Sequence, residues 1–125
     1  MSFSSALRAA LIADADVLAA VSTRIYFVIL PQVPTYPALT IERISGDPHN
    51  TVPSVQALKW ARVRIHAWGE TYKIAYETAK LVETALNGQK TATLRSIYAQ
   101  GAHDNYESTI EKHYISQDFS IWYTE

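Results

Sequence analysis

Residues 57–68 read Ala57-Leu-Lys-Trp-Ala-Arg-Val-Arg-Ile-His-Ala-Trp68, and this stretch decides the fold class. Small or apolar side chains alternate with large aromatic or cationic ones, a pattern that predicts a β-strand with one face in the core. The expected inner face holds Ala61, Val63, Ile65 and Ala67, and the outer face holds Trp60, Arg62, Arg64, His66 and Trp68. Because this stretch would span about 40 Å at ~3.3 Å per residue, we expect its first half to project beyond a sheet.

Two helical segments flank this strand in the sequence. Residues 3–21 carry apolar side chains at three- and four-residue spacing, but the pattern is interrupted at Asp14-Ala15-Asp16. Short acidic side chains favour the start of a helix, so we expect one helix, a joint and a second, shorter helix. Residues 71–86 predict an amphipathic helix, which Asn87-Gly88 ends with a left-handed residue.

The remaining segments are typical of strands and turns. Residues 24–30 and residues 38–44 are rich in β-branched side chains, and Ser45-Gly46-Asp47-Pro48 has the composition of a turn. Residues 91–100 and 110–123 alternate, and residues 101–105 are expected to form the turn between them. The fold class that follows is α+β, an antiparallel sheet of about four strands with two helices packed on one face, in a single domain over residues 1–125.

Composition excludes several classes of function. The 125 residues include 11 Lys+Arg, 12 Asp+Glu and no cysteine, with a formal net charge of −1. A chain without cysteine has no thiol nucleophile and no Cys-ligated metal, and a near-neutral chain lacks the long-range field of a dedicated nucleic-acid binder. No apolar run approaches the ~18 residues of a membrane span, so we expect no membrane partner.

The sequence holds no motif typical of catalysis or metal binding. Four histidines lack zinc spacing, and four widely separated glycines exclude a glycine-rich phosphate loop. Asp14 and Asp16 do not form a carboxylate pair, because residues two apart on a helix point in different directions. We therefore expect no enzyme activity, no metal and no cofactor, although a Ser-His-acid triad assembled by the fold is not excluded by the sequence.

Two features are candidates for a partner interface. Residues 46–56 contain two prolines and no apolar period, which favours a functional or mobile loop. The outer face of the long strand combines Trp and Arg, which are enriched at interface hot spots. Two alternatives remain for this face: a solvated surface neutralised by acids such as Glu42, or a surface on which nucleic-acid bases stack. On this face Arg62 and Arg64 are expected to be solvated in an isolated monomer. The candidate interface residues are Asp47, Pro48, His49, Asn50, Trp60, Arg62 and Arg64.

A resemblance to a known family spans nearly the whole chain. It is carried by Leu7-x-x-x-Leu11 with Asp14, Arg24-Ile25-Tyr26, Pro37, Ile44-Ser45-Gly46-Asp47-Pro48, Ala61-Arg62-Val63-Arg64-Ile65, Trp68-Gly69-Glu70, Asp104-x-Tyr106 and Asp118-Phe119-Ser120-Ile121-Trp122-Tyr123. In their order and spacing these segments resemble the tail-terminator or tail-completion (tail-to-head joining) proteins of long-tailed phages and gene transfer agents. Leu58-Lys59-Trp60 has no counterpart in that pattern.

The resemblance implies a structural virion protein without catalytic residues. Such proteins form a ring, usually a hexamer, at the head-proximal end of the tail tube, where they stop tail polymerisation and meet the head–tail connector. The implied partners are other copies of the chain, the tail tube protein and a connector or stopper protein, and DNA passes through the lumen without specific binding. The implied location is the tail or neck of the virion, with assembly in the host cytoplasm. The alternative is a small ligand-binding or enzymatic α+β domain of unknown substrate.

Overall fold

The computed structural model describes residues 2–32, 34–47 and 59–124. The elements in chain order are α1 (Phe3–Ala13), α2 (Ala15–Val21), β1 (Ile25–Phe27), β2 (Ala38–Asp47), β3 (Lys59–Gly69), α3 (Tyr72–Leu86), β4 (Leu94–Glu107) and β5 (Lys112–Tyr123). None of these helices is both long and apolar enough to cross a bilayer.

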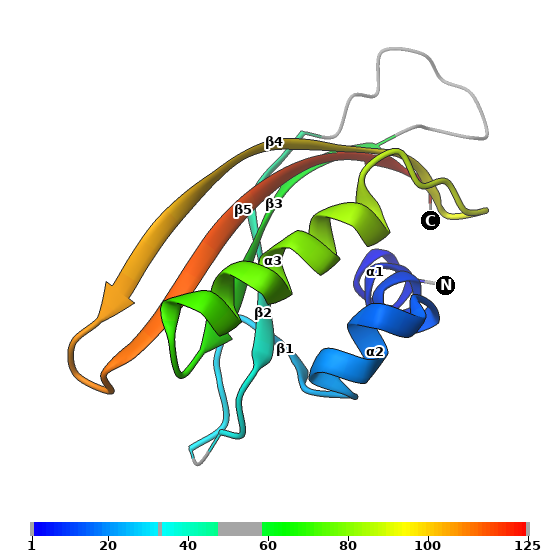
Figure 1. The fold of residues 1–125 in the computed structure, drawn as a ribbon. Coiled ribbons are helices and arrows are strands. Elements are labelled where there is room, and N and C mark those ends of the chain that lie inside the picture. Colours follow the sequence, from blue (N-terminus) through cyan, green and yellow to red (C-terminus); the bar gives the residue numbers. More distant parts are fainter. Residues whose placement is uncertain (1, 33, 48–58, 125) are drawn as a thin grey trace.

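The strands form one curved sheet in the order β1-β2-β3-β5-β4, and the helices lie along its concave side (Figure 1). All neighbouring strands are antiparallel except β1 and β2, which pair in parallel with Ile25 opposite Leu39. The predicted α+β class is confirmed. The described residues form five strands and three helices instead of about four and two. The first helical segment divides at Asp14 as expected, and the short segment after it joins the sheet edge as β1.

The core lies between the helices and the inner face of the sheet. Ala61, Val63, Ile65 and Ala67 are fully buried, as their alternation predicts. Small side chains on β3 let α3 approach closely, and at Gly69 an added Cβ would lie 2.6 Å from the backbone nitrogen of Ala75. This close approach fixes where α3 begins relative to β3.

The start of α2 and the end of α3 agree with the capping residues expected from the sequence. The carboxylate of Asp14 accepts hydrogen bonds from the backbone N–H groups of Asp16 and Val17, at 3.0 and 3.1 Å, and so begins α2. Thr71 caps α3 through the N–H of Ile74 at 3.2 Å. Gly88, with a φ of 81°, follows the end of α3 in the left-handed region.

Three strand predictions were wrong at their ends. The described part of β3 does not project beyond the sheet, because Trp60 pairs with both Asp47 and Trp122. That pairing also carries β2 through residues expected to form a turn. β4 likewise continues through residues 101–105 to Glu107, and Gly101 marks a β-bulge instead of a turn.

Candidate functional site

The side of the sheet that points away from the helices is called the open face below. Its central rows come from β3 and β5, whose register sets each large β3 side chain opposite a polar or aromatic side chain of β5. The opposed pairs are Trp60 and Trp122, Arg62 and Ser120, Arg64 and Asp118, His66 and Ser116, and Trp68 and Tyr114. This arrangement places the candidate interface residues of β3 on one continuous surface.

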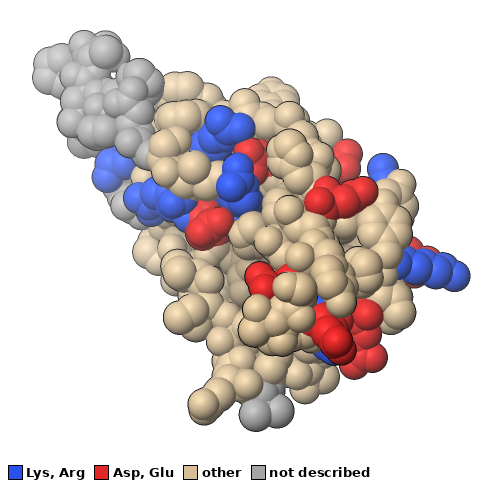
Figure 2. Space-filling view, turned by 90° about the vertical axis from the view of Figure 1, so that its left-hand side faces the viewer, with Lys and Arg blue, Asp and Glu red and all other residues tan. Residues whose placement is uncertain are grey.

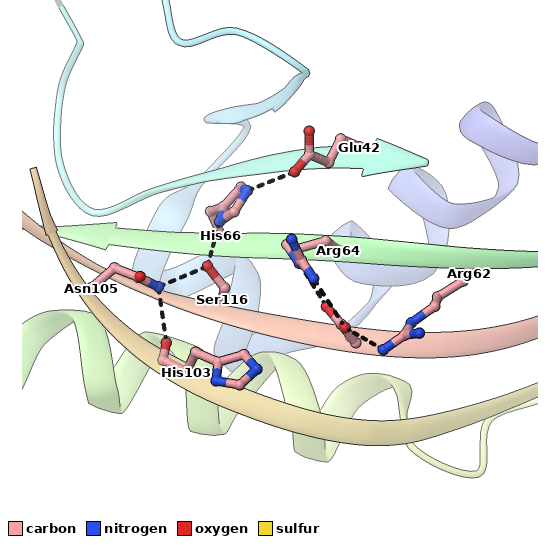
Figure 3. Close-up of polar contacts among 8 residues, drawn as sticks. Glu42, Arg62, Arg64, His66, His103, Asn105 and Ser116 are labelled. Carbon is pink, nitrogen blue, oxygen red and sulfur yellow. Dashed lines mark hydrogen bonds and ion pairs between the residues drawn. The ribbon is translucent and has the colours of Figure 1, made fainter. Parts of the chain in front are cut away.

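Asp118 is the centre of a cluster with two arginines. Arg62 Nη2 donates to its Oδ2 at 2.8 Å, and Arg64 donates from Nε to Oδ1 at 2.8 Å and from Nη2 to Oδ2 at 3.3 Å. Figure 3 shows the two guanidinium groups converging on this one carboxylate. The Asp118 side chain is 7% exposed, whereas those of Arg62 and Arg64 are 44% and 35% exposed. The cluster is therefore anchored inside the sheet and exposed at its two cationic ends.

The electrostatics of the cluster favour the ionised carboxylate. The hydrogen bond from Arg64 lowers the pKa of Asp118 below its usual range, and the hydrogen bond from Arg62 adds to this effect. Burial acts in the opposite direction, but it does not outweigh the arginines. The same contact raises the pKa of Arg64. Two positive charges thus share one negative charge, and the cluster keeps a net positive charge.

The structure corrects the expected state of the two arginines. Both lie on the predicted face, but they are bound to Asp118 and are not simply solvated. Glu42, the acid expected to neutralise them, hydrogen-bonds to His66, and its charge makes only the last of the contributions that raise the pKa of Arg64. Sequence reasoning did not identify Asp118 as their partner, because it lies more than fifty residues from both arginines. The alternation of residues 115–123 predicts only that Asp118 points away from the core.

A second chain of hydrogen bonds runs across the open face from β2 to β4. Glu42 Oε1 lies 3.0 Å from His66 Nε2, and His66 Nδ1 lies 2.7 Å from Ser116 Oγ. Asn105 Nδ2 donates to the same Ser116 hydroxyl at 3.0 Å and to the backbone oxygen of His103 at 3.2 Å (Figure 3). Side chains from four adjacent strands are joined in this way.

A carboxylate, a histidine and a serine joined by hydrogen bonds in this order are also the components of a hydrolase triad. Here the serine is unsuited to nucleophilic attack. Ser116 is 5% exposed, and its hydroxyl already has two partners. Its backbone is paired with His66 on one side and His103 on the other, so it cannot supply the free N–H of an oxyanion hole. The arrangement is suited to holding strands in register.

Both ends of the β3 row are also ordered by side-chain contacts. Trp60 Nε1 donates to Ser120 Oγ at 2.7 Å, and Trp68 Nε1 donates to Thr40 Oγ1 at 3.0 Å. The Trp68 ring stacks on Tyr114 with 4.3 Å between ring centroids. Trp60, Trp68 and Tyr114 are therefore held in fixed orientations, which lowers the entropy lost when a partner covers them.

The structure brings part of the predicted interface together. Asp47 ends β2 directly opposite Trp60, and Trp60, Arg62 and Arg64 follow one another along the open face. Pro48, His49 and Asn50 lie outside the described residues. Among the residues that are described, no group of three or more His, Asp or Glu side chains is placed to hold a metal ion.

Comparison with known proteins agrees with the resemblance in the sequence. Residues 5–124 match the family model of "Tail completion protein gp17". A chain from a solved structure titled "Virion of native gene transfer agent (GTA) particle" has the same fold, with a TM-score of 0.73 at 18% identity over 99% of this chain and 96% of that chain. No curated protein matches. Because the family model covers nearly all of the sequence, the chain belongs to the tail completion protein family and is a structural protein of the virion tail.

Proposed function

We propose that the chain assembles into a ring, a hexamer, at the head-proximal end of the tail tube. There the ring stops polymerisation of the tube and joins the tail to the head connector or stopper protein. The observation that carries this proposal is the family match over residues 5–124. The ring, its stoichiometry and its two neighbours are the steps that the proposal adds to that family membership.

The two edges of the sheet support a ring. The edge strand β1 has three residues, whereas the opposite edge strand β4 has fourteen. Because the two edges are unlike, a contact that joins one edge to the other is heterologous. A contact between two unlike surfaces repeats from one copy to the next, and it produces a closed ring when the rotation between copies divides a full turn.

The proposed contacts are the predicted interface residues. Trp60, Arg62 and Arg64 lie on a preordered face, and arginine and tryptophan are typical of interface hot spots. Asp47 ends β2 opposite Trp60, and Pro48, His49 and Asn50 follow it in the sequence. In the proposed assembly this end of the sheet meets neighbouring subunits, the tail tube protein or the connector.

The charge of the chain is compatible with DNA passing through the ring. With 11 Lys+Arg and 12 Asp+Glu, each copy has a formal net charge of −1. A strongly basic lumen would bind the phosphate backbone and slow its passage, because each neutralised phosphate adds to the affinity. A near-neutral subunit gives no such general attraction, so in this proposal DNA is cargo and not a ligand.

The proposal is tested by deleting the gene from a particle-producing strain and by measuring the mass of the purified protein. We expect tails of irregular length that are detached from heads, and a complex of six copies by native mass spectrometry. Restoring the gene should restore tail length and attachment. Normal particles without the gene would contradict the proposed function, and a complex of another size would contradict the hexamer alone.

A further inference from the structure

An exposed aromatic surface lies at the end of the sheet near the β4–β5 hairpin. Tyr72, Tyr76 and Tyr106 are 44%, 44% and 54% exposed. Their rings gather around His113: Tyr106 and Tyr72 lie 4.8 and 6.2 Å from it, and Tyr76 lies 6.0 Å from Tyr72, between ring centroids. Asp104 accepts a hydrogen bond from the Tyr72 hydroxyl at 3.1 Å. These five residues are called the tyrosine surface.

The surroundings of the tyrosine surface are mainly acidic. The hydrogen bond to Asp104 raises the pKa of Tyr72, so this hydroxyl remains neutral. The charged residues at this end of the sheet, besides Asp104, are Glu70, Glu77, Glu107 and Glu111 against Lys73, Lys80 and Lys112. The Lys80 ammonium lies 5.7 Å from the centroid of the Tyr76 ring. An exposed surface of aromatic rings and carboxylates is a site for cations, which bind both groups.

The opposite end of the sheet carries arginines. Arg62 and Arg64 extend from the Asp118 cluster with 44% and 35% of their side chains exposed. Arg95 is exposed at the start of β4, and it makes no hydrogen bond or ion pair with the described part of the chain. These three residues are called the arginine surface. Figure 2 shows a cluster of Lys and Arg at one end of this side of the molecule, and most of the Asp and Glu, with a few Lys or Arg, toward the other.

One copy of the chain cannot join its own two surfaces. On β5, Ser120 is opposite Arg62 and His113 is opposite Tyr106, and these two residues are seven positions apart. Seven residues of strand span about 23 Å. Arg62 also lies on the open face, whereas α3, which bears Tyr72 and Tyr76, lies on the other side of the sheet (Figure 1). The two surfaces point away from each other.

We propose that the arginine surface of one copy binds the tyrosine surface of the next copy in the ring. This inference rests on the proposed function and specifies which residues form its repeated contact. Guanidinium groups pair with carboxylates and stack on aromatic rings, so Arg95 and the exposed ends of Arg62 and Arg64 are complementary to Asp104 and the tyrosines.

A second copy of the chain satisfies both surfaces at once. In a closed ring each copy contributes one arginine surface and one tyrosine surface, so none of either kind remains uncovered. The charges also balance, because an excess of positive charge at one end of the sheet meets an excess of negative charge from the neighbouring copy. The tail tube and connector would then contact the two rims of the ring.

The test exchanges the charges of Arg95 and Asp104, neither of which contacts the Asp118 cluster. Arg95→Glu and Asp104→Arg are each made alone and then together, and Arg8→Glu on α1 is the matched control. Ring formation is followed by analytical ultracentrifugation, and urea unfolding checks that each variant folds. Each single change should weaken association by about tenfold or more, since like charges then oppose each other. The double change should restore most of that loss, and Arg8→Glu should have little effect.

A mixture of the two single variants supplies a second readout. Arg95→Glu keeps its tyrosine surface and Asp104→Arg keeps its arginine surface, so one wild-type contact can form between them. The two altered surfaces carry exchanged charges and can also pair, as in the double variant. We therefore expect the mixture to form rings in which the two variants alternate, with weaker association of either variant alone. If each single variant alone forms rings as well as wild type does, this contact is wrong and the proposed ring is unaffected. A folded wild-type chain that stays monomeric would contradict the ring and the contact together.

Discussion

Replacing Asp118 by Asn tests whether the arginine cluster stabilises the folded chain. Asn has nearly the same shape as Asp, so the change removes the negative charge without leaving a cavity. It also places an amide group, which cannot accept a hydrogen bond through its nitrogen, opposite two guanidinium groups. The wild-type carboxylate accepts three hydrogen bonds, at 2.8, 2.8 and 3.3 Å.

The expected cost is about 2 kcal/mol of unfolding free energy. A hydrogen bond to a charged group contributes roughly 1.5–3 kcal/mol, and removing one partner of a fully buried ion pair costs about 3–5 kcal/mol. Asp118 is nearly buried, but Arg62 and Arg64 remain partly exposed and can be hydrated when the carboxylate is gone. Solvent screening of the arginines therefore keeps the cost below that of a fully buried pair.

Urea unfolding between pH 7 and pH 3 measures this cost and its origin. Because the arginines hold the pKa of Asp118 below its usual range, the wild-type advantage is complete above the unfolded-state pKa of about 3.9. It is lost as the pH falls through the lower, folded-state pKa. The difference between wild type and Asp118→Asn should be constant from pH 7 to about pH 5 and should shrink below about pH 4.

Variants of the arginines complete the experiment. Arg64→Met should cost more than Arg62→Met, because Arg64 makes two of the three hydrogen bonds and is less exposed. If Asp118→Asn is as stable as wild type at pH 7, within about 0.5 kcal/mol, the cluster adds no net stability. A difference that does not change with pH would show that packing, and not the charge, is responsible.

Three further changes probe packing and capping. Gly69→Ala should destabilise by about 1–3 kcal/mol in thermal unfolding, because its Cβ would meet the backbone of Ala75 at 2.6 Å; unchanged stability would show that α3 can shift. Asp14→Ala removes the cap of α2 and should cost about 1 kcal/mol in urea unfolding, with Asp14→Asn retaining most of the stability. Gln117→Leu removes a buried amide oxygen that has no partner among the described residues, and also a hydrogen bond of 2.8 Å to the Ala79 carbonyl. Urea unfolding should therefore show a change within about 1 kcal/mol, and a loss above about 2 kcal/mol would mean that this hydrogen bond dominates.

Local patterns predicted most of the elements. The alternation of Ala61, Val63, Ile65 and Ala67 identified the buried face of β3, because side chains two residues apart lie on the same face of a strand. The cap at Asp14 identified the start of α2, because it depends on neighbours within three residues. Periodicity and caps are short-range properties, and a single sequence displays them directly.

Strand ends and cross-strand partners could not be predicted in the same way. Gly101 has the composition of a turn, but pairing with Asp118 on β5 carries β4 past it through a bulge. The choice of Asp118 over Glu42 as the partner of Arg64 depends on the register of two strands more than fifty residues apart. The resemblance supplied the family, because the order of many short segments survives where no single motif is diagnostic.

The chain of side chains from Glu42 through His66 and Ser116 to Asn105 has a mechanical consequence. It runs perpendicular to the strands and links β2, β3, β5 and β4 through contacts that are independent of the backbone ladder. Tension applied across the sheet, from one edge to the other, would load these side chains in series. In the proposed function the chain lies at a joint between head and tail, and such a joint transmits pressure and recoil. These cross-ties lie along the direction in which the sheet would otherwise split between strands.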